Sequence, residues 1–278
     1  MVARLALLIL CWLLPGAALA AEPRCLSCHA AHHAELGGCL DCHRGDPRSS
    51  RPEIAHFGLI PARYSHFRMP ESALVERGGK RIDETGCRRC HVIGRRGNRL
   101  ATDLDQSVRA SAPEELAGAI RRPVLFMPDF HWPEPLLDEV VNALFAAGKD
   151  GKEAEDELPR IVHFEVEGTA GENPFVKHCG SCHRVLTAAA GGLGASDYAP
   201  NLSGLLTPFF PVEYREKEPF SRENLKKYLD NPRQTRPLTR MAPVRLEEGE
   251  YRRLLEIIAE DISILPPDAP QAPLRDIP

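Results

Sequence analysis

The chain has 278 residues and contains the pattern Cys-x-x-Cys-His four times. This spacing is the attachment site of a c-type haem: two thiols bond to the haem vinyl groups, and the adjacent imidazole is placed to bind the iron. The four repeats use every cysteine except Cys11, so the pattern predicts four covalently bound haems. Their cysteine pairs are Cys25 and Cys28, Cys39 and Cys42, Cys87 and Cys90, and Cys179 and Cys182, and their histidines are His29, His43, His91 and His183.

Two other uses of paired cysteines are possible in principle. Cys-x-x-Cys pairs can bind zinc, and eight cysteines in an exported chain can form four disulfides. Neither use explains why a histidine follows the second cysteine in every repeat. We therefore favour haem attachment over zinc binding or disulfide formation.

Residues 1–20 have the features of a secretory signal peptide. Arg4 gives a positive start, an apolar stretch runs to Leu14, and a small-residue cleavage site ends at Ala20. Cys11 lies in the apolar stretch and would be removed with it. The alternative is an uncleaved membrane anchor. No later stretch is apolar for long enough to span a bilayer, so we expect an exported, periplasmic protein without a transmembrane segment after cleavage.

The formal net charge of the sequence is −4 at pH 7. Eight haem propionates would make the loaded protein more negative still. A protein that binds nucleic acid needs a basic surface, so nucleic acid is not an expected partner.

The repeats resemble those of multihaem c-type cytochromes, here a tetrahaem one. Residues 21–70 carry two repeats in little protein, with Gly and Pro breaks and no sustained helical or strand periodicity. This segment resembles compact dihaem segments in which each iron has two histidine ligands. The resemblance implies that the haems themselves form most of its core.

Residues 71–148 and 167–265 each resemble a class I cytochrome c domain, which implies a mainly α fold. In each, a short helix follows the motif, a Met-Pro or Met-Ala-Pro loop comes next, and an apolar-striped helix closes the domain. The helices expected before the two loops begin at 113 and 221, and one closing helix is expected over 134–147. Residues 149–166 are predicted to be a charged linker and residues 266–278 a disordered, proline-rich tail.

The resemblance implies axial ligands beyond the four motif histidines. Met127 and Met241 stand where the class I methionine ligand is expected, whereas Met69 is expected to be structural. For the first two haems the candidates are His32, His33, His56 and His66. His32 and His33 follow His29 too closely to reach the opposite face of the same iron, so one of them is expected to serve the second haem and His56 the first.

Two histidine ligands favour a low reduction potential, whereas methionine opposite histidine raises it. We therefore favour an electron carrier over an enzyme. It would relay single electrons between a membrane quinol-oxidising complex and a terminal reductase or surface acceptor. One alternative is an oxidoreductase in which the third iron is open to a small molecule such as peroxide, nitrite or a sulfur oxyanion, with Arg121, Arg122 and His131 nearby. Another is a fixed cytochrome subunit of a respiratory complex.

Overall fold

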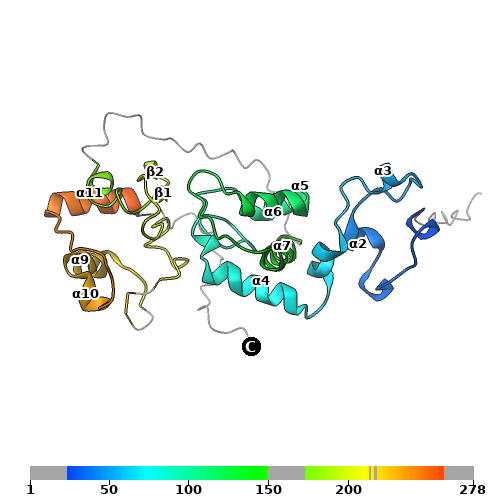
Figure 1. Ribbon diagram of the computed structural model, residues 1–278, viewed down its shortest axis with the longest axis horizontal. Coiled ribbons are helices and arrows are strands. Elements are labelled where there is room, and N and C mark those ends of the chain that lie inside the picture. The colour runs from blue at the N-terminus through cyan, green and yellow to red at the C-terminus, as the bar shows by residue number, and fades with distance from the viewer. Residues whose placement is uncertain (1–23, 150–172, 213, 216–217, 260–278) are drawn as a thin grey trace, which may run out of the picture. The chain divides into compact units, whose positions relative to one another are not determined.

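The computed structural model describes residues 24–149, 173–212, 214–215 and 218–259 (Figure 1). The fold is mainly α, as the sequence predicts, and divides into two units, one ending at Leu59 and the other beginning at Ile60. Within the described ranges, no helix is both long enough and apolar enough to cross a membrane. The predicted signal peptide, linker, tail and His163 lie outside the described residues, apart from Lys149 at the start of the linker.

The first unit has little regular structure. It consists of two short 3₁₀ helices, η1 (Arg24–Ser27) and η2 (Ala34–Leu36), and two short α-helices, α2 (Cys39–His43) and α3 (Pro52–Ala55). None of these elements contains a buried residue. The first unit therefore has no side-chain core of its own within the described residues.

The second unit begins earlier than predicted, at Ile60 instead of residue 71. The 3₁₀ helix η3 (Ala62–Arg68) buries Tyr64 and Phe67 against the helix α7 (Glu134–Gly148), which explains the shift. Met69 caps this 3₁₀ helix through its backbone N–H. The remaining elements around this first core are α4 (Ala73–Glu84), η4 (Cys87–Arg89), α5 (Leu104–Ala110) and α6 (Pro113–Arg121).

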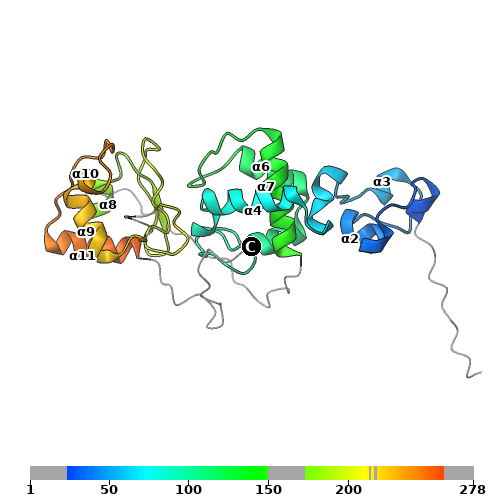
Figure 2. The same cartoon turned by 90° about the horizontal axis from the view of Figure 1, so that it is seen from below.

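Helices α4 and α7 make the main contact in this core and lie side by side in both views (Figures 1 and 2). At Gly78 the helices approach so closely that an added Cβ would lie 2.0 Å from the carbonyl oxygen of Glu139. The Glu139 carboxylate accepts hydrogen bonds from Arg77 at 2.6 Å and Arg81 at 2.7 Å. Burial opposes its ionisation, but the bonds from Arg81 and Arg77 outweigh burial and hold the pKa of Glu139 below its usual value.

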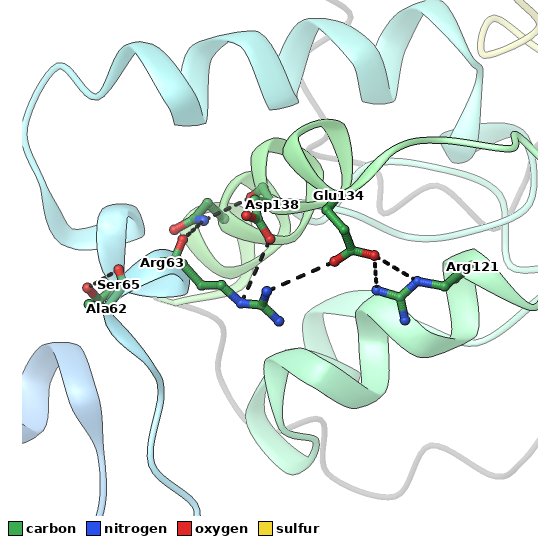
Figure 3. A network of polar contacts seen from close by, with 7 residues as sticks. Ala62, Arg63, Ser65, Arg121, Glu134 and Asp138 are labelled. Carbon is green, nitrogen blue, oxygen red and sulfur yellow. Dashed lines mark hydrogen bonds and ion pairs between the residues drawn. The ribbon is translucent and has the colours of Figure 1, made fainter.

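A second polar network joins η3, α6 and α7 (Figure 3). Arg121 donates two hydrogen bonds to Oε1 of Glu134, at 3.0 and 2.6 Å, and Arg63 lies 4.0 Å from Oε2 of the same carboxylate. Arg63 also lies 4.0 Å from Asp138, and Asn142 donates to the Arg63 carbonyl at 2.8 Å. The network fixes the start of α7 against the preceding elements.

The second core of this unit is built by later segments. It contains α8 (Pro174–His178), the antiparallel strands β1 (Val185–Thr187) and β2 (Gly191–Leu193), α9 (Arg222–Asp230), α10 (Pro232–Thr235) and α11 (Glu248–Ile258). Ser221 caps α9 by accepting the N–H of Asn224 at 3.2 Å, as the sequence predicts. Tyr251, Leu254 and Ile258 form the buried face of α11.

Candidate haem sites

The eight motif cysteines of the described chain are thiols, not disulfides. No three His, Cys, Asp or Glu side chains of the described residues gather as a metal-ion site. A haem iron does not need such a cluster, because the porphyrin supplies most of its ligands and the protein supplies one or two. The test of fit is therefore whether imidazoles and methionines lie where axial ligands must lie.

The first unit brings four of its described histidines together in two close pairs, one with tilted rings and one with rings edge to face. The ring centroids of His29 and His56 are 6.0 Å apart, and those of His32 and His43 are 5.7 Å apart. Two imidazoles on opposite sides of one iron have nitrogens about 4 Å apart, twice a metal–nitrogen bond, and ring centroids roughly 6 Å apart. Both pairs therefore have the separation that an iron between them requires.

The other two histidine candidates have different neighbours. The ring centroid of His33 lies 5.4 Å from that of His32, and not beside a motif histidine in the described contacts. His33 has a left-handed backbone with φ 51°, and its Nδ1 lies 3.3 Å from the Glu35 carboxylate. His66 is exposed on η3, in the second unit. The structure thus brings His56 to the first motif and His32 to the second. Among the described contacts, neither His33 nor His66 has its ring within 6 Å of the ring of a motif histidine.

Apolar side chains surround these pairs without packing into a core. Leu26 and Leu40 lie inside the two motifs, and Ile54 and Phe57 flank His56. All four are exposed, Phe57 to 82%. Exposed apolar groups beside facing imidazoles fit two porphyrin faces, which would cover them and supply the apolar filling that the protein lacks.

In the second unit, the two motif histidines are held in the same way. Nδ1 of His91 lies 2.7 Å from the Thr102 carbonyl oxygen, and Nδ1 of His183 lies 2.7 Å from the Pro200 carbonyl oxygen. A metal-ligating imidazole generally donates its second N–H to such an acceptor, which fixes the ring and leaves Nε2 for the metal. In both rings Nδ1 is engaged by a backbone carbonyl, which leaves Nε2 for another partner.

The loops behind these histidines require glycine. Gly97 has φ 134° and its Cβ position lies 2.0 Å from the His91 carbonyl oxygen. Gly194 has φ 84° and its Cβ position lies 2.1 Å from the His183 carbonyl oxygen. A side chain at either position would displace the histidine backbone, and the positive φ would strain it further.

Burial sets the protonation of several motif groups. It lowers the pKa of His91, although the hydrogen bond to Thr102 and the charge of Asp103 oppose this, and so favours the neutral imidazole that binds metals. Burial also raises the pKa of Cys87. It raises the pKa of Cys179 to about 11, with a smaller contribution from the neighbouring charge of Cys182. In both cases the main cause is removal of the thiol from water, which disfavours the charged thiolate.

The two candidate methionines are half-buried in loops that precede the closing helices. Met127 follows α6 in a turn closed by its N–H and the Val124 carbonyl at 3.2 Å. Met241 precedes α11, where its side chain packs against the second core. Each loop lies between the helix that precedes it and the closing helix in the chain, and no described contact joins Met127 to His91 or Met241 to His183.

Other residues considered near the sites have different partners. Arg121 binds Glu134, so its guanidinium is engaged within the protein instead of serving a propionate or an anion. The His131 side chain is 83% exposed and lies 3.1 Å from Asp129. His178, which directly precedes Cys179, lies 3.2 Å from Glu250 on α11.

Sequence reasoning missed the acceptor of His91. The acceptor of His183 belongs to residues 199–202, Ala-Pro-Asn-Leu. Its counterpart is 101–104, Ala-Thr-Asp-Leu. The shared Ala-x-Asx-Leu pattern was the available signal.

No protein-family model, curated protein or solved structure matches the chain significantly. The function is therefore inferred from the residues of the sites and their geometry.

Proposed function

We propose that the chain is a tetrahaem c-type cytochrome that relays single electrons between respiratory partners in the periplasm. The observation that carries this proposal is the pair of facing imidazole pairs, His29 with His56 and His32 with His43, at 6.0 and 5.7 Å. They lie in a unit whose described elements bury no side chain, and a large apolar cofactor would supply the core that these elements lack.

The protein residues have three roles in this proposal. The motif cysteines would attach each haem covalently, the motif histidines would each supply one ligand to an iron, and His32, His56, Met127 and Met241 would supply the second ligands. Reversible one-electron uptake by iron is the chemistry that the four haems supply when bound. The carbonyl oxygens of Thr102 and Pro200 orient His91 and His183 for this role.

The ligand sets imply a direction of electron flow. Two sites with paired histidines have lower reduction potentials than two sites with histidine and methionine. Electrons would therefore enter from a low-potential donor, such as a quinol-oxidising membrane complex, at the first unit. They would leave from the second unit to a terminal reductase or surface acceptor. The two folding units of the chain support this separation of entry and exit.

The side chains around the third site favour a carrier over an enzyme. An open iron that acts on an anion needs cationic or proton-donating groups directed at it. Arg121 is instead bound to Glu134, and His131 is exposed beside Asp129. We therefore assign no catalytic residue.

A potentiometric titration of the haem-loaded chain, followed by low-temperature electron paramagnetic resonance, tests the proposal. We expect four low-spin ferric signals in the oxidised protein. On reduction, two of them should disappear at high potential and two at low potential. A stoichiometric high-spin signal in the oxidised protein would instead show an open iron and support the enzyme.

A further inference from the structure

The third and fourth motifs lie within one folding unit and are joined by a side chain of the third motif itself. Arg89 stands between Cys87 and Cys90, and its Nη1 donates a hydrogen bond of 2.8 Å to the carbonyl oxygen of Asn201. Asn201 belongs to the loop behind His183. A residue of one haem attachment loop therefore binds the histidine-supporting loop of the other.

Asn201 also binds back to the first core through its side chain. Its Nδ2 donates to the Phe126 carbonyl oxygen at 3.0 Å, directly before the candidate ligand Met127. The Phe126 ring lies against the hairpin of the second core, where a Cβ on Gly192 would be 2.0 Å from the ring. Arg184, the residue after His183, stacks over the same ring with its guanidinium carbon 5.9 Å from the centroid.

Only one peptide unit separates this bridge from the fourth site. The carbonyl of Pro200, the residue before Asn201, accepts from Nδ1 of His183 at 2.7 Å. The side chain of Asn98 adds a second connection, since it donates to the Arg89 carbonyl at 2.9 Å and lies 3.1 Å from Oγ1 of Thr207. The attachment loop and methionine loop of the third site thus both rest on the loop that orients His183.

We propose that Arg89 and Asn201 are positioning residues that couple the third and fourth haem sites into one electron-exchange unit. This inference rests on the proposed function. The guanidinium charge of Arg89 lies beside both sites, and charge interactions are strong where water is excluded. Oxidation adds positive charge to an iron, so a nearby guanidinium raises the potential of each of the two sites.

The test is a potentiometric titration of the haem-loaded Arg89→Gln variant. We expect the potentials of both histidine–methionine haems to fall, while those of the two bis-histidine haems do not move. Arg88→Gln is the matched control, because it removes the same charge from the same motif. Arg88 is bound to Asp83 and to the Ile93 carbonyl within the first core, so its loss should move only the third haem.

A second variant tests positioning without changing any charge beside the third motif. Asn201→Leu removes the side-chain donor to the Phe126 carbonyl and the acceptor of the Ser203 N–H, and it leaves Arg89 and the Asn201 backbone carbonyl in place. We expect unchanged haem content, a perturbed methionine–iron absorption band at the third site and slower electron exchange between the two sites after photoreduction. The coupling would be overturned if the Asn201 variant changed only the fourth site and Arg89→Gln shifted only the potential of the third haem.

The outcomes distinguish the two proposals. Wild-type protein without haem on Cys87 and Cys90, or on Cys179 and Cys182, would contradict the proposed function itself. Full haem content and methionine ligation, with Arg89→Gln acting on the third haem alone, would contradict only the coupling.

Discussion

The imidazole rings of His29 and His56 face each other with centroids 6.0 Å apart, although 27 positions of sequence separate them. The chain returns by way of α3, whose C-cap is His56. Asp46 and Ala55 close this loop through a backbone hydrogen bond of 2.9 Å. The loop thus delivers a second imidazole to the first motif, as an axial ligand pair requires.

Replacing His56 should open the first iron. In His56→Ala, loss of the facing imidazole is expected to convert one low-spin haem to high-spin, as counted by electron paramagnetic resonance of the oxidised protein. His66→Ala is the control, because His66 is exposed and lies in the other unit. Loss of a low-spin signal in the control and not in His56→Ala would reverse this assignment.

The neighbours His32 and His33 should differ in the same measurement. His32 faces His43 at 5.7 Å, whereas Nδ1 of His33 lies 3.3 Å from Glu35. His32→Ala is therefore expected to give a high-spin second haem and a raised potential at that site, while His33→Ala leaves four low-spin haems. Equal effects of the two substitutions would show that the choice between them is not fixed by the fold.

Adjacent glycines in α4 should respond oppositely to alanine. At Gly78 an added Cβ would lie 2.0 Å from the Glu139 carbonyl oxygen, so the helices must separate. Overpacking of this kind costs about 2 kcal/mol of the free energy of unfolding. Gly79 has open space around its Cβ position, so Gly79→Ala should be neutral or stabilise by up to about 1 kcal/mol through helix propensity. Denaturant unfolding of the loaded protein measures both, and a loss at Gly79 as large as that at Gly78 would be inconsistent with this close approach.

Glu250 should make the second core sensitive to acid. Hydrogen bonds from Lys177 and then His178 hold its pKa at about 2. The pKa of Glu250 is lower in the folded chain than in the unfolded chain. Ionised Glu250 therefore stabilises the fold above the pKa of the unfolded chain, and this stabilisation is lost as the pH falls toward the pKa of the folded chain. When the pH is lowered from neutral to acid, the unfolding midpoint should therefore fall less in Glu250→Gln than in wild type. Glu248→Gln, in the same helical turn, should retain the full wild-type dependence.

The elements that the sequence predicts are those with a clear apolar stripe or cap. Helix α7 was expected over 134–147 and spans Glu134–Gly148, and Ser221 caps α9 as predicted. Helix α4 was not predicted, because half of its residues are charged, it contains two glycines and it buries only Gly78 and Ile82. Its place depends on contact with α7, which local sequence does not encode.

The candidate ligands were predictable to different degrees. The reach of the chain was enough to direct His56 to the first motif and His32 or His33 to the second. The choice of His32 over His33 as the candidate ligand depends on the left-handed backbone at His33, which no pattern of residues predicts. The bridge from Arg89 to Asn201 spans 112 positions and requires the packed arrangement of the unit.

Intact mass measurement of the mature chain under denaturing conditions tests the central claim most directly. Thioether bonds survive unfolding, so four haems should remain attached to each chain and should map to the four motif peptides after digestion. A chain that loses all added mass on unfolding, or that carries zinc or disulfides on these cysteines, would contradict the account.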